Sequence, residues 1–330
     1  MQRILFLIFT SSLLFLGYFS FNVLAIQGFI NPTIEKPSEE MIIKEGDSYL
    51  SEVKKLIGNP LEFTSGSHKK AGTSMEQNRS ALIKNSTIVT YQVDGDTLST
   101  KNINYKNANQ VKYAEDTSQH KELWESFTTI IPTDLRTNVK SFSVFSDGAS
   151  NLLGYVDSLD YNGDTWQLGV DYADSKDEKN FYYTLIHEYG HLLTLSSDQM
   201  VSNYDWKTTG EKEATYSSFY GKSNTDSYMN LYYQKFWLDY YQEWQQLNKQ
   251  NDTAAKNAFY TEHAEDFLTP YAVTHPEEDI AESWTFFVLS PKESNVTVAQ
   301  KKQNFFYQFP KLVEIRTEIL KNLLTEAKKD

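Results

Sequence analysis

Residues 187–191 read H-E-Y-G-H, and this run carries side chains whose types and spacing suit a zinc site. Residues four apart lie on one face of a helix, so His187 and His191 would offer two imidazole nitrogens to one Zn²⁺. Glu188 would lie beside the metal and take a proton from zinc-bound water. With six histidines in 330 residues, an accidental match is on the order of a 1% event, so the motif predicts a metal site.

A catalytic zinc site needs a third protein ligand, and the composition restricts its type. The chain has no cysteine, so this ligand must be a histidine or a carboxylate. The best donors lie downstream in residues 274–284, T-H-P-E-E-D-I-A-E-S-W, where Thr274 and Glu277 have the spacing of a capping box. A helix that carries the third ligand is therefore predicted to begin here.

His275, Glu278 and Glu282 share one stripe of this predicted helix, since they are spaced i, i+3 and i+7. Glu282 stands mid-helix between Ala281 and Ser283, whose small side chains permit close approach to the helix of residues 187–191. We assign Glu282 as the third ligand of one Zn²⁺ per chain. Glu278 is the alternative ligand.

These two segments also resemble a known class of enzymes. The elements H-E-[FY]-G-H and A-E, at 187–191 and 281–282, are similar to those of gluzincin-type zinc metallopeptidases, the group of lethal-factor-like and Pro-Pro endopeptidases. Residues 168–191 and 270–284 resemble more closely the zinc-binding metallopeptidases of Gram-positive bacteria. The resemblance covers about Lys140–Leu289. It implies a zincin-like catalytic domain that hydrolyses peptides, with His187, His191 and Glu282 as ligands and Glu188 as the base.

Two further roles on the downstream helix are open. Lethal-factor-like enzymes carry a Tyr seven residues before the ligand Glu, and His275 stands at that position if Glu282 is the ligand. His275 would donate a hydrogen bond to the negative charge that develops in the transition state, with Tyr271 as its rival. Otherwise His275 is only the first residue of a helix. Glu278 or Asp279 would hydrogen-bond a ligand imidazole and fix its tautomer.

Period-two alternation, helical spacing and turn residues predict the elements around these segments. Strands are expected at Ile88–Val93, Lys140–Phe145, Leu153–Ser158 and Trp166–Tyr172, with turns at 94–96 and at Asn162-Gly163, the latter of type I′. Helices are expected at His120–Ile131, from a capping box at Ser175–Glu178, over Tyr228–Trp244 and over Pro310–Lys328. An extended substrate would pair with the strand Trp166–Asp171.

Strands that precede helices indicate an α+β fold, with a small N-terminal mixed sheet, a helical C-terminal part and the zinc cleft between them. The predicted catalytic domain is residues 85–330, strand-rich over 85–174 and helical over 175–330. Residues 26–84 are predicted to be a polar linker and N-terminal extension. They contain a short helix near Ser48–Leu56 and a loose loop around Ser65–Ser80.

The composition of residues 1–25 predicts that the protein is exported from the cytoplasm. One charge, Arg3, precedes an apolar run from Ile4 to about Ile26, and Val23-Leu24-Ala25 offers a signal-peptide cleavage site. The run is also long enough to span a bilayer, so an uncleaved N-terminal anchor is the alternative. Both interpretations place the protein outside the cytoplasm, either secreted or anchored to the outer face of the cell membrane. Any membrane contact would be through this segment alone.

The charge balance restricts the partners. The chain has 31 Lys and Arg against 44 Asp and Glu, a net charge of −13, which disfavours nucleic-acid binding. We therefore expect a secreted or surface-anchored zinc metalloendopeptidase that acts on a protein or peptide substrate. The alternatives are a zinc amidase acting on cell-wall peptides and a non-catalytic, zinc-stabilised binding protein.

Overall fold

The computed structural model describes residues 37–60, 75–104, 108–148, 152–201, 215–218, 220–250 and 253–328. The chain divides into two compact units, Met1–Met41 and Ile42–Asp330. The predicted export segment, residues 1–25, lies outside the described residues. Among the helices that the structure describes, none has the length and apolar character needed to cross a membrane.

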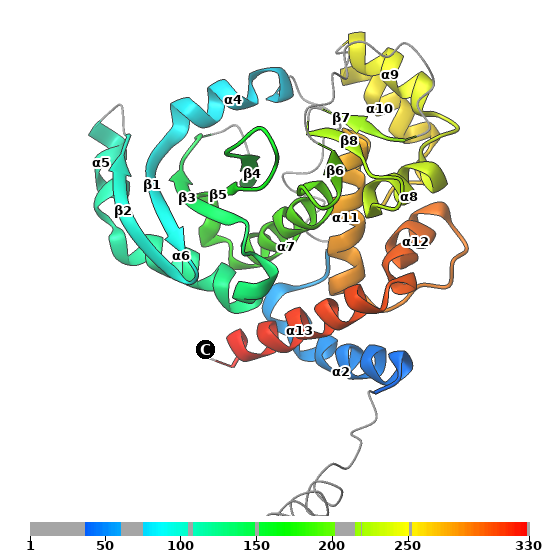
Figure 1. Ribbon diagram of the computed structural model, residues 1–330, viewed down its shortest axis with the longest axis horizontal. Coiled ribbons are helices and arrows are strands. Elements are labelled where there is room, and N and C mark those ends of the chain that lie inside the picture. Colours follow the sequence, from blue (N-terminus) through cyan, green and yellow to red (C-terminus); the bar gives the residue numbers. More distant parts are fainter. Residues whose placement is uncertain are drawn as a thin grey trace, which may run out of the picture. The chain divides into compact units, whose positions relative to one another are not determined.

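The second unit contains a mixed sheet (Figure 1). Its strands are β1 (Thr87–Asp94), β2 (Thr97–Ile103), β3 (Val139–Phe145), β4 (Gly154–Ser158) and β5 (Trp166–Asp171). They lie in the order β2-β1-β3-β5-β4, in which β3 and β5 are parallel and the other neighbours are antiparallel. The predicted strands are confirmed, whereas β2 was not predicted because its side chains are mostly polar and exposed. The substrate strand predicted at Trp166–Asp171 is not at an edge, since β5 lies between β3 and β4.

The two predicted turns have different outcomes. The chain turns at 95–96 as expected, with Gly95 at φ +57°. A hairpin also joins β4 to β5, and Gly163 has φ +70°, but Asn162 is not among the described residues with positive φ, so the type I′ prediction is wrong. The loop is longer, and the Asp160 carboxylate organises it by accepting backbone N–H bonds from Asn162 at 2.9 Å and Asp164 at 3.1 Å.

Helices and short strands make up most of the rest. The helices are α2 (Glu39–Ile57), α4 (Met75–Ser86), α5 (Ala108–Glu115), α6 (Thr117–Ile130), α7 (Glu178–Leu195), α8 (Tyr228–Phe236), α9 (Tyr241–Gln250), α10 (Thr253–Glu262), α11 (Pro276–Leu289), α12 (Val298–Gln303) and α13 (Pro310–Glu326). Short 3₁₀ turns are η1 (Thr133–Leu135), η2 (Asp174–Lys176) and η3 (Asn304–Gln308), and a small sheet has the order β6 (Met200–Val201), β8 (Gly221–Ser223), β7 (Ser217–Ser218). A mixed α+β fold with a helical C-terminal part is therefore confirmed.

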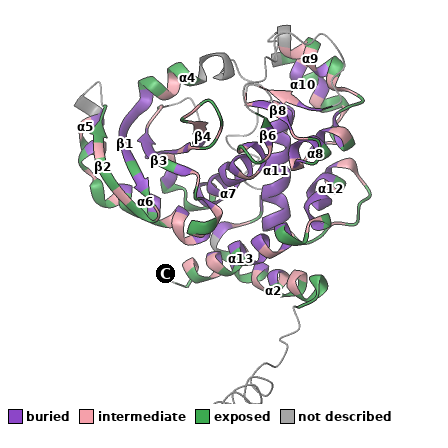
Figure 2. Cartoon of the chain, viewed as in Figure 1, coloured by how far each residue is buried: buried purple, intermediate pink, exposed green. Residues whose placement is uncertain are grey.

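Several predicted helix boundaries were wrong. The helix expected at Ser48–Leu56 begins already at Glu39, and α4 occupies the C-terminal part of the loop expected at Ser65–Ser80. The helix expected over Tyr228–Trp244 is two helices, because the chain turns at residues 237–240. The apolar side chains at helical spacing in that segment nevertheless belong to the core or pack against it: Met229, Tyr232, Phe236, Tyr240 and Trp244. The helices α11 and α7 are the most thoroughly buried of the described helices (Figure 2).

Candidate metal centre

The helix α7 carries His187, Glu188 and His191. Its N-cap is Asp177, whose carboxylate accepts the N–H of Asn180 at 3.3 Å. The capping box predicted at Ser175 is wrong, because Ser175 belongs to the 3₁₀ turn η2 and its hydroxyl donates to the Tyr172 carbonyl. The helix therefore starts close to the predicted place with a different cap. All three motif side chains are buried.

The helix α11 crosses α7 where both carry small residues. A Cβ on Gly190 of α7 would lie 3.3 Å from the Cα of Ala281 and 3.0 Å from the Trp284 ring. This confirms the prediction that small residues near Glu282 permit close approach to α7. The N-cap of α11 is His275 with Pro276 at the first helical position, so the capping box predicted at Thr274 is wrong.

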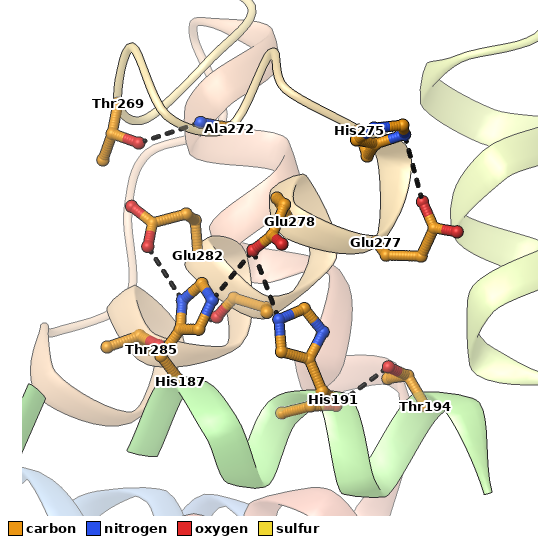
Figure 3. Close-up of polar contacts among 12 residues, drawn as sticks. His187, His191, Thr194, Thr269, Ala272, His275, Glu277, Glu278, Glu282 and Thr285 are labelled. Carbon is orange, nitrogen blue, oxygen red and sulfur yellow. Dashed lines mark hydrogen bonds and ion pairs between the residues drawn. The ribbon is translucent and has the colours of Figure 1, made fainter. Parts of the chain in front are cut away.

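The crossing brings two imidazoles and one carboxylate together (Figure 3). Oε2 of Glu278 lies 3.1 Å from Nε2 of His187 and 3.2 Å from Nε2 of His191. Two ligand atoms that are each about 2.0–2.2 Å from a tetrahedral zinc ion lie about 3.4 Å apart, so these separations are close to those of a zinc ligand set. The three side chains form a buried group that is able to hold a metal ion.

Glu282, predicted from the sequence as the third ligand, lies at the other side of His187. Its Oε1 is 2.9 Å from Nδ1 of His187, and its Oε2 accepts a hydrogen bond from the Tyr183 hydroxyl at 2.9 Å. Both imidazoles direct Nε2 toward Glu278, so a metal shared by them would lie on that side, away from Glu282. The group that could hold a metal ion therefore contains Glu278, the alternative, and not Glu282. Glu282 takes the place expected of a carboxylate that fixes a ligand imidazole.

Spacing alone could not separate the two glutamates. Glu278 and Glu282 are four residues apart, so both face α7 from adjacent turns of one helix. The crossing position of the helices, set by Gly190 and Ala281, decides which carboxylate meets both Nε2 atoms. Tyr183 was not singled out either, although it stands four residues before His187 on the same helix face, and this spacing was a usable signal.

The close approach of these groups shifts their proton equilibria. Burial by itself lowers the pKa of His187, but hydrogen bonding and charge from Glu278 and Glu282 outweigh it and raise this pKa to about 10. Burial likewise raises the pKa of Glu278, yet His191 and His187 outweigh it and hold that pKa well below its usual range. The carboxylates of Glu278 and Glu282 therefore favour a positive charge between them.

Glu188 is available as a proton acceptor. The side chain is 5% exposed, and among the described residues its Oε2 has no hydrogen-bond partner. A buried carboxylate oxygen without a donor is unfavourable for stability. Its presence here marks Glu188 as a candidate proton acceptor. Nδ1 of His191 is also buried without a partner in the described part of the chain.

The structure separates the two rivals for the transition-state donor. The Tyr271 ring lies 6.0 Å from the His187 ring, centre to centre. The His275 ring lies instead 5.1 Å from that of Trp244, and its Nδ1 is 4.0 Å from the carboxylate of Glu277 (Figure 3). His275 is thus directed away from the two metal-site imidazoles, and this geometry favours Tyr271 as the candidate donor.

Asp279, the other carboxylate considered as an imidazole partner, points in a different direction. Its Oδ2 pairs with Nζ of Lys302 at 2.7 Å and accepts Nε1–H of Trp237 at 2.8 Å. Both charged side chains are fully buried, and burial raises the pKa of Asp279 and lowers that of Lys302. This pair joins α11 to α12.

Two further histidines within the described ranges have partners away from the site. His120 is buried between the Tyr91 hydroxyl and the Tyr113 carbonyl, each 2.8 Å from a ring nitrogen. His263 pairs with Asp266 at 3.2 Å. His68 lies outside the described residues.

A second acidic group comprises Asp147, Asp171 and Asp174, after β3 and at the end of β5. The Asp171 carboxylate accepts backbone N–H bonds from Ala173 at 2.7 Å, from Asp174 at 3.1 Å and from Asp147 at 3.0 Å. Burial outweighs these bonds and raises the pKa of Asp171 to about 6. These backbone hydrogen bonds give Asp171 a structural role, since they connect the segment after β3 to the segment after β5.

Comparison with known proteins adds no relative. No protein-family model, no curated protein and no solved structure matches the chain.

Proposed function

We propose that this protein is a zinc-dependent peptidase in which His187, His191 and Glu278 hold the metal and Glu188 is the general base. One observation carries the proposal: both Nε2 atoms converge on a single carboxylate oxygen, at 3.1 and 3.2 Å, in a buried site on the H-E-x-x-H helix. The predicted resemblance to gluzincins agrees with this arrangement, and an exported or surface-anchored location is part of the proposal.

With Glu278 in place of Glu282 as the third ligand, the chain agrees with that family at one further position. Seven residues before Glu278 stands Tyr271, the residue type that lethal-factor-like enzymes carry seven residues before their ligand Glu. Because the Tyr271 ring lies beside His187, its hydroxyl is our candidate donor to the charge that develops on the substrate carbonyl oxygen. His275 has no role in this proposal.

Zn²⁺ bound here would supply Lewis-acid chemistry, polarising a carbonyl and acidifying water. Glu188 then accepts a proton from the attacking water and passes it to the leaving amine. The buried position of Glu188 strengthens its interactions with the reacting groups, because charges interact more strongly where water is excluded.

An extended substrate would pair with β4, one of the two edge strands of the sheet, and not with β5. A Cβ on Gly154 would lie 2.7 Å from Cγ2 of Thr184 and 3.5 Å from Cγ of Glu188, so the β4 backbone passes close to the proposed base. Hydrogen bonds along this edge would hold a peptide in extended form near Glu188.

The test is the metal content and peptidase activity of Glu188→Gln. The wild-type chain should bind one zinc per molecule and cleave peptides from a mixed library, with cleavage blocked by a chelator. Glu188→Gln should keep its zinc and lose at least about 100-fold in turnover, since it cannot accept the proton. Zinc binding without any cleavage by the wild type would instead favour a zinc-stabilised binding protein. Normal cleavage by Glu188→Gln would contradict the mechanism.

A further inference from the structure

Three side chains form a buried series of polar contacts between α7 and α11, made of one ion-pair contact and one hydrogen bond. Glu282 is 0% exposed, and its two oxygens meet different partners on α7: Nδ1 of His187 at 2.9 Å and the hydroxyl of Tyr183 at 2.9 Å. Tyr183 is itself 1% exposed and lies one helical turn before His187. Neither Glu282 nor Tyr183 belongs to the group of atoms that would surround a metal.

The tautomers of imidazole explain how these contacts would affect metal binding. An imidazole that binds a metal through Nε2 carries its proton on Nδ1, and an acceptor at Nδ1 selects that tautomer and fixes the ring plane. The Glu282 carboxylate lies 2.9 Å from Nδ1 of His187, the position from which it would accept that proton. A buried carboxylate also needs donors of its own, which the Tyr183 hydroxyl supplies at the second oxygen. Among the described residues, Nδ1 of His191 has neither a hydrogen-bond partner nor an ion-pair contact with a carboxylate, whereas Nδ1 of His187 has the ion-pair contact with Glu282.

We propose that Glu282 and Tyr183 are positioning residues that hold His187 in its metal-binding tautomer and orientation. The metal affinity then depends on a tyrosine hydroxyl that does not touch the metal. This inference rests on the metal site of the proposed function, but not on peptide hydrolysis.

The test measures the zinc dissociation constant of the full-length protein by competition with a chromophoric chelator. Tyr183→Phe should weaken zinc binding by about 10-fold and Glu282→Gln by about 10- to 100-fold, the range seen when such outer partners are removed. The matched control is Tyr232→Phe, which deletes another buried hydroxyl that bonds to α11, at Ser283 Oγ 2.7 Å away, without reaching an imidazole. It should bind zinc within about twofold of wild type.

A spectroscopic measurement separates positioning from loss of folding. In ¹⁵N-labelled, zinc-loaded protein, the Nδ1–H resonance of His187 should shift in Tyr183→Phe and Glu282→Gln and stay in place in Tyr232→Phe. Matching thermal melts for Tyr183→Phe and Tyr232→Phe would assign the affinity difference to His187.

The outcomes distinguish this inference from the proposed function. If the wild type binds no zinc, both are wrong. If the wild type binds zinc and both Tyr183→Phe and Glu282→Gln bind it equally well, the positioning role is refuted while the metal site stands. If Glu282→Gln abolishes binding and Glu278→Gln does not, Glu282 is a ligand, and the positioning role is again refuted.

Discussion

At the scale of single residues, two glutamates four positions apart contact different nitrogen atoms of the imidazoles. Glu278 meets both Nε2 atoms, whereas Glu282 meets Nδ1 of one imidazole only. If the ligand is Glu278 and not Glu282, the residue seven positions before the ligand is Tyr271 and not His275. This change of ligand moves the proposed transition-state donor from His275 to Tyr271, the side chain that lies beside His187.

Tyr271→Phe should therefore lower kcat by about 100-fold, the effect of removing one donor to a developing oxyanion. KM and zinc content should change little, because the hydroxyl acts on the transition state and holds no metal. The control is His275→Ala, which should leave kcat nearly unchanged. Steady-state kinetics on one fluorogenic peptide compare the two. The reverse order of effects would return the role to His275.

At the scale of elements, the site depends on how closely α7 and α11 approach each other. Gly190 and Ala281 face each other at the crossing, and the Trp284 ring covers the same place. A helix-interior glycine costs roughly 0.5–1 kcal/mol relative to alanine, so its presence here is explained by packing. The crossing brings the Glu278 carboxylate within hydrogen-bond distance of two imidazoles on the other helix.

Gly190→Val should separate the two helices. Overpacking of a close crossing costs about 1–3 kcal/mol in the free energy of unfolding, and the Glu278 carboxylate would move away from both Nε2 atoms. Zinc affinity should fall with stability. Gly190→Ala is the graded comparison, since its Cβ needs only a small adjustment of Trp284 and Ala281, and its helix propensity offsets part of the strain. Denaturant unfolding and zinc competition measure both effects. Unchanged zinc affinity in Gly190→Val would show that the crossing distance does not control the site.

At the scale of the whole molecule, the N-terminal helix α2 is tied to the end of the chain. The buried Arg316 of α13 donates to Oδ1 of Asp47 at 2.7 Å and to the carbonyls of Phe287 at 2.7 Å and Ser290 at 3.1 Å. One guanidinium thus joins α2, α13 and the C-terminal end of α11. Residues 42–57, assigned by sequence to a linker and extension, belong to the same compact unit as the metal site.

Asp47→Ala should lower the free energy of unfolding by about 1 kcal/mol or more, because it leaves a buried guanidinium without its carboxylate. The partial exposure of Asp47 moderates the loss. The control is Glu52→Ala on the same helix, whose partner Lys55 is 72% exposed, so that little change is expected. Thermal melts of both variants measure the difference. Equal melting temperatures for Asp47→Ala and wild type would mean that this tie adds nothing to stability.

The sequence by itself determined the chemical inventory and most of the elements. Helical spacing placed His187 and His191 on one face, and alternation found β1, β3, β4 and β5, because these patterns are local. It missed β2, whose polar side chains show no buried face, and it misjudged both caps, because a 3₁₀ turn and a proline shifted each helix start.

Only the tertiary structure decided which glutamate meets the imidazoles, which strand is an edge and which ring lies beside His187. Each depends on contacts between segments far apart in the chain. The Glu278–His187 contact, for example, joins residues 91 positions apart. Period and propensity describe one element at a time, whereas the distance between α7 and α11 is set by side-chain volumes on both. For that reason the sequence favoured Glu282 on its small neighbours, whereas in the fold Glu278 is the carboxylate that meets both Nε2 atoms.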